Sequence, residues 1–295
     1  MIDLHTHLLW DWDDGPDDRA QTRTMCKIAE KDGTKTICLT PHIFRMTRHG
    51  DDLGVLHQRM VEFDDEMRAH GIDIEFHWGA EVYVHAEIVR AIEQYRFTID
   101  QTSYVFLEFA ANGVPVGAAN MLAQLMSKGF VPIISHPERN QGFAARPELL
   151  FEFVSMGCAA QVTAASLTGE LGKEVRTTAG LFLVNNLVHI IASDAHRAIG
   201  RPPGLSQAVA AAAKLVGESK ARAMVTEVPR AILENKALPD WGEPENPLRR
   251  KTWTQRLIGM PRRSLRPAGG GGGGGANGKG GRRSGSSPTT VLKIK

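Results

Sequence analysis

The sequence contains few cysteines and no long apolar run. Cys26, Cys38 and Cys158 are widely spaced and have apolar neighbours in the 295-residue chain, which predicts reduced core thiols rather than a disulfide framework. No stretch approaches the roughly 20 apolar residues that span a bilayer. The first residues also lack the basic start and the cleavage site of a signal peptide. We therefore expect a globular, cytoplasmic protein.

Acidic residues are missing from the last part of the chain. Residues 249–295 contain 12 Lys and Arg but no Asp or Glu, whereas residues 1–248 carry 23 basic and 33 acidic side chains. Seven consecutive glycines begin at Gly269, and such a composition cannot bury enough apolar surface to fold. We predict an acidic folded domain over residues 1–240 and a low-complexity, disordered, basic tail over residues 241–295.

Short β-rich runs alternate with helical patterns over the first 240 residues. The seven predicted strands are IDL, TICLT, IEFHWG, YVFLEF, VPIIS, AAQVT and HIIAS. Glycines suited to left-handed helix ends follow several of the predicted helices, at Gly33, Gly71, Gly129 and Gly157. Repeated strand and helix units predict a parallel α/β sheet, and at this length a TIM-like barrel of about seven (βα) units. An open, doubly wound sheet is the alternative.

Residues able to bind metal follow six of the seven predicted strands. The carboxyl ends of the strands of a βα barrel meet on one face, so side chains distant in the sequence become neighbours there. With one aspartate of the opening segment, the candidate ligands are His5, His7, Asp14, His42, Glu81, Glu108, His136, Asp194 and His196. We expect the remaining histidines on the surface or in packing contacts, namely His49, His57, His70, His77, His85 and His189.

Five imidazoles and four carboxylates exceed what one ion needs when positions are left open for water. The set suits two or three ions that share a bridging carboxylate. The absence of a cysteine ligand argues against a purely structural zinc site and admits harder ions such as manganese or iron. An excess of positive charge at such a site would suit a phosphate ester.

The motifs that carry these residues resemble one known family. In order they are H-T-H, D-D-G, T-P-H, G-A-E-V-Y, L-E-F, I-S-H-P-E-R-N and A-S-D-A-H. Over about residues 1–237 they are similar to the bacterial protein-tyrosine phosphatases of the PHP superfamily, of the CpsB/CapC/YwqE type. The resemblance implies a distorted seven-stranded barrel with three divalent metal ions, usually manganese, with iron or zinc as alternatives.

The resemblance also implies which residues hold each metal. His5, His7, Glu81 and Asp194 would hold one ion, and Glu81 would bridge to a second ion held by Glu108 and His136. Asp14, His42 and His196 would hold the third. Arg139 and Arg201 lie in loops of the same face and would bind phosphate oxygens, because guanidinium groups suit such oxygens. With these two arginines we count His42 as catalytic.

The expected substrate is a phosphotyrosine in a protein, such as a bacterial tyrosine kinase that controls capsule or exopolysaccharide synthesis. The nearest alternative is the same chemistry on a small molecule such as histidinol phosphate. A further alternative is a metal-retaining regulatory scaffold whose basic tail binds nucleic acid or membrane. We expect no specific nucleic acid as a partner, and the sequence leaves the oligomeric state open, including a homo-oligomer.

Three further features have no settled role in the sequence. Tyr83, Trp10 and Trp12 could form an aromatic wall for a tyrosyl ring, although aromatic side chains near strand ends are usually packing residues. No residue of the segment 43–50, which follows T-P-H, matches a specificity role. In the tail, apolar residues among basic ones could contact the inner face of an anionic membrane, and a solvated tail is the alternative.

Overall fold

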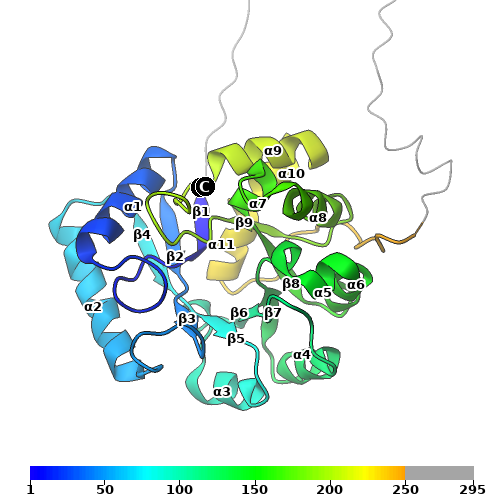
Figure 1. The fold of residues 1–295 in the computed structure, drawn as a ribbon, viewed down its shortest axis with the longest axis horizontal. Helices are drawn as coiled ribbons and strands as arrows, with labels where there is room; N and C mark the ends of the chain where they lie inside the picture. The colour runs from blue at the N-terminus through cyan, green and yellow to red at the C-terminus, as the bar shows by residue number, and fades with distance from the viewer. Residues whose placement is uncertain (250–295) are drawn as a thin grey trace, which may run out of the picture. The chain divides into compact units, whose positions relative to one another are not determined.

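The computed structural model describes residues 1–249, in which parallel strands form a curled sheet surrounded by helices (Figure 1). The predicted tail from residue 250 onward lies outside the described residues. The strands are β1 (Ile2–Thr6), β2 (Thr36–Leu39), β3 (His42–Ile43), β4 (Glu75–Trp78), β5 (Glu81–Tyr83), β6 (Tyr104–Glu108), β7 (Val131–Ile134), β8 (Ala159–Thr163) and β9 (Ile190–Ala192).

Helices connect the strands at nearly all of the predicted positions. They are α1 (Arg19–Lys31), α2 (Leu53–Ala69), α3 (Ile88–Tyr95), α4 (Ala118–Ser127), α5 (Gln141–Ala145), α6 (Glu148–Ser155), α7 (Ala164–Thr168), α8 (Lys173–Val184), α9 (Ser206–Val216), α10 (Glu218–Ala223) and α11 (Glu227–Leu233). Two short 3₁₀ turns, η1 (Ile99–Gln101) and η2 (Pro137–Arg139), lie among them.

Local chemistry explains where the first helices begin and end. The side chain of Asp18 caps α1 by accepting the Gln21 N–H at 2.9 Å, and Asp52 caps α2 in the same way. The four glycines predicted at helix ends all have positive φ angles, as a left-handed stop requires. These capping residues and glycines therefore mark helix ends in the sequence.

Every strand pair is parallel, which confirms the parallel α/β class. The structure has nine strands among its described residues, in the orders β1-β2-β4 and β3-β5-β6-β7-β8-β9, so the count of seven is not confirmed. The two extra strands, β3 and β5, follow the predicted strands TICLT and IEFHWG after interruptions at Pro41 and at Gly79. Hydrogen bonds still cross both interruptions, from the Gly79 N–H to the Leu39 carbonyl and from the Glu81 N–H to the Pro41 carbonyl.

The sheet is curled, so that its first and last strands meet at their carboxyl ends. Thr6 of β1 forms a parallel bridge with Ala195, just after β9. The N–H of Asp194 donates to the His5 carbonyl, and the N–H of His7 donates to the Ala195 carbonyl, both at 2.9 Å. The ends of β1 and β9 are therefore fixed relative to each other.

The apolar interior has two parts. The larger cluster joins the outer faces of the strands to the helices. The smaller cluster joins inward-facing strand residues to α11, which lies behind the curled sheet in Figure 1. Side chains alternate along a strand, so Phe106 of this inner cluster and Glu108 point to the same side. The polar side chains at the strand ends thus lie directly next to the inner apolar cluster.

The described chain keeps contacting the domain after Asp240. The indole N–H of Trp241 donates to the Val188 carbonyl at 2.9 Å, and the Trp241 carbonyl accepts from Lys220. The three cysteines are buried and unpaired. Within residues 1–249, no helix combines the length and the hydropathy that a bilayer crossing requires.

His189, packed against Trp241, predicts an acid-sensitive contribution to stability. Its Nδ1 accepts the Ala160 N–H, and burial together with nearby Lys220 lowers the pKa of His189 to about 4. The unfolded chain takes up this proton below about pH 6.5 while the folded chain does not, so stability falls as the pH drops from 6.5 towards 4.

We expect metal-free wild type to lose about 1–2 kcal/mol more unfolding free energy between pH 7 and pH 5 than His189→Asn does. Asparagine keeps an acceptor at this position but does not titrate. Urea unfolding at both pH values measures the difference, and parallel losses in the two proteins would contradict the role of His189.

Candidate metal centre

All nine predicted ligands come together at the carboxyl ends of the strands. Strand β1 and the turn after it supply His5, His7 and Asp14, and the starts of β3 and β5 supply His42 and Glu81. The other four follow or end β6, β7 and β9. Three overlapping groups of potential ligand atoms result: His5, His7 and Glu81; His42, Glu81 and Glu108; and His7, Asp14, His42 and His196. His136 and Asp194 belong to none of these groups, but they lie 3.0 Å from Glu81 and 3.6 Å from His7, respectively.

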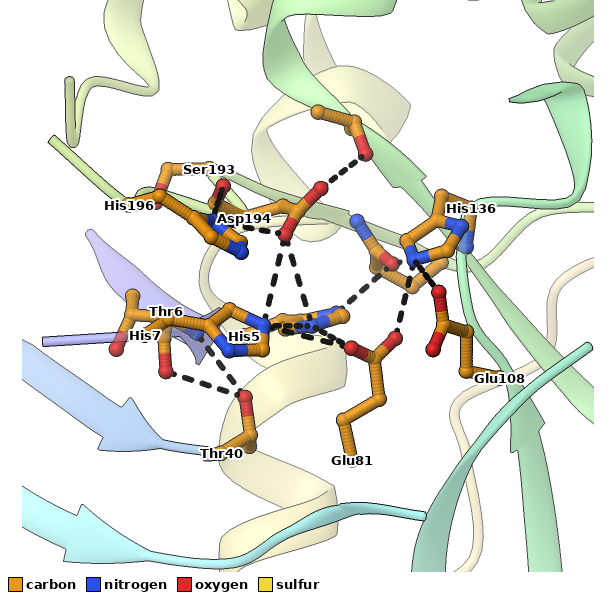
Figure 2. A network of polar contacts seen from close by, with 12 residues as sticks. His5, Thr6, His7, Thr40, Glu81, Glu108, His136, Ser193, Asp194 and His196 are labelled. Carbon is orange, nitrogen blue, oxygen red and sulfur yellow. Dashed lines mark hydrogen bonds and ion pairs between the residues drawn. The ribbon is translucent and has the colours of Figure 1, made fainter. Parts of the chain in front are cut away.

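The first metal position is the tightest of the three. The Nε2 atoms of His5 and His7 lie 3.1 Å apart, and each lies 3.4 Å from Glu81 Oε2. Asp194 Oδ1 lies 3.9 Å from the first nitrogen and 3.6 Å from the second. Figure 2 shows these side chains converging from opposite sides. Ligand atoms around one divalent ion with bonds of about 2.0–2.2 Å have separations of this size.

The orphaned oxygens of Glu81 favour a metal over a hydrogen-bond network. Glu81 is fully buried, and neither of its oxygens accepts a well-oriented hydrogen bond from the described residues. Ring nitrogens of His136 and His42 nevertheless lie 3.0 and 3.1 Å from these oxygens. Buried polar atoms without partners are rare in proteins, so this donor set fits divalent ions placed between the carboxylate and the imidazoles.

The second position lies on the other side of Glu81. His136 Nε2 is 3.0 Å from Glu81 Oε1 and 4.0 Å from Glu108 Oε1. His136 has a φ of 31°, a left-handed conformation that non-glycine residues rarely adopt. It follows β7 at the point where the chain turns into η2. Glu81 thus faces both positions, one oxygen to each.

The third position is built around Asp14. Its Oδ1 lies 3.1 Å from His196 Nε2 and 3.5 Å from His42 Nε2. This oxygen is buried and has no hydrogen-bond partner among the described residues. The ring centroids of His7 and His196 lie 4.0 Å apart, so the third position adjoins the first.

Two polar residues that were not predicted orient the ligands. Asp13 Oδ2 lies 2.9 Å from His7 Nδ1 and accepts the backbone N–H of His42 at 3.0 Å. Gln161 Oε1 lies 3.1 Å from His5 Nδ1 and accepts the N–H of His136. Both contacts hold an imidazole with its Nε2 toward the first position. A glutamine inside the buried strand AAQVT was a signal that could have identified Gln161.

Three arginines contact the carboxylates from outside. Arg139 and Arg201 both donate to Asp194 Oδ2, the second at 2.7 Å, while Asp194 Oδ1 faces the histidines. Arg45 donates to Glu108 Oε1. The first two were predicted at this face, and Arg45 was missed because it lies in the segment 43–50, to which no role was assigned.

Charge and burial together set the protonation of the cluster. Burial alone would raise the pKa of Glu81, but His5 and His136 outweigh it and hold the pKa well below its usual range. Burial would also raise the pKa of Asp194, but the neighbouring Arg139 and histidines outweigh it and lower this pKa. Burial and His7 lower the pKa of His42 to about 4. Ionised carboxylates and a neutral His42 are the forms that bind metal.

The structure revises one hypothesis about aromatic residues. Trp10 and Trp12 are 3% and 0% exposed, so neither lines the site and the wall hypothesis is wrong for both. Trp10 stacks on Phe63 in the core, and Trp12 donates its indole N–H to the His42 carbonyl. None of the other six histidines belongs to a group of potential ligands within the described part of the chain.

The contacts of Asp13 predict that it strengthens metal binding without being a ligand. We expect Asp13→Asn to weaken Mn²⁺ binding by about 10- to 100-fold, because the neutral amide no longer raises the basicity of His7. Competition with a chelator measures the affinity. Asp17→Asn is the matched control, since Asp17 lies in the same segment but pairs with Arg48 near the surface. Equal affinity in Asp13→Asn and wild type would contradict the assignment.

Comparisons with known proteins agree with this geometry. The tyrosine-protein phosphatase YwqE of Bacillus subtilis is 30% identical over 258 residues, which cover 85% of this chain and 98% of that protein. The tyrosine-protein phosphatase CpsB of Streptococcus pneumoniae is 27% identical over 239 residues, covering 79% of this chain and 98% of that protein.

A solved structure from work on YwqE and CpsB, described as metal-dependent tyrosine phosphatases, superimposes with a TM-score of 0.77 at 29% identity. It covers 85% of this chain and all of that one. A lactonase of Listeria monocytogenes, at 14% identity and a TM-score of 0.54, shares the fold alone. The family model described as "Capsular polysaccharide synthesis, CpsB/CapC" matches residues 1–234. The chain therefore belongs to the CpsB/CapC family.

Proposed function

We propose that this protein is a metal-dependent protein-tyrosine phosphatase, a phosphoric monoester hydrolase that acts in the control of capsule or exopolysaccharide synthesis. The observation that carries the proposal is the largely buried cluster of nine candidate ligands around Glu81. The relatives of this chain, YwqE and CpsB, are tyrosine-protein phosphatases, and their alignments cover 85% and 79% of this chain.

The nine residues would hold three divalent ions, with manganese the first candidate and iron or zinc the alternatives. His5, His7, Glu81 and Asp194 would take the first ion, and Glu81, Glu108 and His136 the second. The third would be held by Asp14, His42 and His196. When bound, such ions polarise phosphoryl oxygens and activate water at neutral pH. Histidine and carboxylate donors without cysteine suit this group of metals.

Arg139 and Arg201 would bind the phosphate of the substrate. Their side chains are 32% and 29% exposed and both are held by Asp194 at the mouth of the site. Being fixed, they can stabilise the negative charge that develops on the phosphoryl oxygens without moving. The rest of the domain is acidic, so these local cations are needed to attract an anionic substrate.

Phosphotyrosine suits a site with this composition. A tyrosinate has a conjugate acid with a pKa of about 10, so it leaves with less acid assistance than an alkyl alkoxide requires. The three buried cysteines cannot serve as a nucleophile, since burial raises the pKa of Cys26 and Cys158 to about 12. Hydrolysis would therefore proceed by direct attack of water rather than through a phosphocysteine.

We further propose a tyrosine-phosphorylated protein in the cytoplasm as the substrate, with a bacterial tyrosine kinase as the first candidate. The expectation that the basic tail reaches the inner face of the membrane, where such a kinase would lie, concerns residues outside the described part of the chain. The same holds for the predicted disorder of the tail from residue 250 onward, whereas Trp241, at its start, contacts the domain. A homo-oligomer also stays a prediction.

A substrate panel tests the proposed function. On manganese-loaded protein, we expect kcat/KM for a phosphotyrosyl peptide to exceed that for a phosphoseryl peptide and for histidinol phosphate. Arg139→Ala should reduce kcat/KM about 10²- to 10³-fold on every substrate without loss of metal, and Arg201→Ala should act in the same direction. Arg146→Ala is the control, because Arg146 lies nearby in the sequence but is exposed at the end of α5.

Two results would contradict the proposal in different ways. A preference for histidinol phosphate would replace the substrate class and leave the metal chemistry intact. No hydrolysis of any ester by fully metal-loaded protein would favour the regulatory scaffold instead.

A further inference from the structure

Arg45 lies between an aromatic ring and a predicted metal ligand. Its guanidinium carbon is 5.1 Å from the centroid of the Tyr83 ring, and its Nη1 donates to Glu108 Oε1. Tyr83 and Glu108 are register partners on the neighbouring strands β5 and β6. The guanidinium thus bridges two adjacent strand ends at the edge of the metal centre.

The segment around Arg45 is anchored rather than loosely solvated. Phe44 and Met46, on either side of it, both have left-handed backbone conformations, with φ angles of 67° and 57°. The Phe44 ring packs edge-on against His85 and Phe97. The backbone N–H of Phe44 donates to Asp51 Oδ1 at 2.9 Å. Such backbone strain persists only where surrounding contacts maintain it, so the orientation of Arg45 is built into the loop.

A small cleft opens beside Arg45 and leads to the ligands. Its volume is about 80 Å³, and Arg45 and Arg139 line it together with Glu108, Phe109, Ser135 and His136. The cleft therefore has one of the proposed phosphate-binding arginines, two ligands of the second metal position and an apolar ring on its walls. A phosphate bound by Arg139 at the metal centre would have its ester group in or near this cleft.

We propose that this cleft receives the phenyl ring of the phosphotyrosyl substrate, and that Arg45 is the residue that selects an aryl over an alkyl phosphate. The inference rests on the proposed function and specifies its substrate pocket. Tyr83 covers one face of the guanidinium, and 33% of the Arg45 side chain remains exposed. The uncovered face can stack on the substrate ring, which completes a sandwich of ring, guanidinium and ring.

The flat shape of the guanidinium is essential to this role. A stacked guanidinium attracts an aromatic face through its charge and its planar surface, whereas an alkyl phosphate offers no such face. Lysine keeps the charge that pairs with Glu108 but cannot stack in the same way. The Arg45→Lys variant therefore separates selection of the ring from support of the metal ligand.

Binding of two phosphonates tests the proposal directly. Benzylphosphonate and methylphosphonate are titrated by calorimetry into manganese-loaded wild type, Arg45→Lys and Arg45→Ala, with the metal content of each protein measured in parallel. We expect Arg45→Lys to weaken benzylphosphonate about 3- to 30-fold with methylphosphonate nearly unchanged and the metal retained. The KM for a phosphotyrosyl peptide should rise by a similar factor while kcat changes little.

Arg96→Lys is the matched control. Arg96 also stacks on an aromatic ring, at 5.7 Å from the Phe130 centroid, but it follows α3 and its partner ring precedes β7, at the opposite end of the strands from the metal centre. This variant should bind both phosphonates as wild type does.

The possible failures are distinguishable. Equal weakening of both phosphonates in Arg45→Lys, with or without loss of manganese, would show that Arg45 acts through charge or through Glu108 and would overturn the inference. Unchanged discrimination between the two phosphonates would overturn it as well. If wild type hydrolyses no phosphotyrosyl peptide, the proposed function fails instead.

Discussion

The buried carboxylate of Glu81 is the constraint on which the site depends. One of its oxygens faces His5, His7 and His42, and the other faces His136. An ionised carboxylate without hydrogen-bond donors is strongly destabilising in a protein interior. The neighbouring histidines offset this cost, and divalent ions between the carboxylate and the imidazoles would offset it further, which requires the surrounding strands to converge closely.

Several features of the fold serve that convergence. The interruption at Gly79 separates β4 from β5, so that Glu81 begins a new strand and still donates its N–H across to Pro41. The bridge between Thr6 and Ala195 fixes β1 against the end of β9. Without that contact, Asp194 would not face His5 in β1 and His7 just after it. The curled sheet is therefore a condition of the metal geometry.

The outer contacts follow a common arrangement. Asp194 presents Oδ2 to Arg139 and Arg201 and leaves Oδ1 for the histidines. Glu108 binds Arg45 through Oε1, which also lies 4.0 Å from His136, and its Oε2 lies 3.8 Å from His42. The arginine fixes the orientation of the carboxylate and offsets its charge, and the same arginine reaches the mouth of the site. The groups that orient ligands are thus also the groups available to a phosphate ester, which suits an acidic domain that must bind an anion.

The positions of the candidate ligands could be predicted from the sequence, because they depend mainly on where each strand ends. The position of a histidine or carboxylate after a predicted strand identified eight of the nine candidates, which lie close together because parallel strands all end on one face. The ninth, Asp14, comes from the turn after β1. The short strands β3 and β5 were missed, since each follows a predicted strand after a break at Pro41 or Gly79 and contains only two or three residues.

Side-chain partners were harder to predict than strand ends. Asp13 and Asp14 are adjacent, and only the turn geometry decides that the first orients His7 while the second faces His196. The orientation of Arg45 depends on the left-handed backbone conformations of Phe44 and Met46, which non-glycine residues rarely adopt. The roles of Trp10 and Trp12 could not be predicted, because burial rather than residue type decides whether an aromatic ring packs in the core or lines the substrate site.

Electron paramagnetic resonance of the manganese-loaded protein tests the central claim that Glu81 is shared between two metal positions. Ions that share a carboxylate lie about 4 Å apart and couple magnetically. We predict an exchange-coupled spectrum in wild type that is lost in Glu81→Ala. A fully loaded wild-type protein that gives only the spectrum of isolated Mn²⁺ ions would contradict the account.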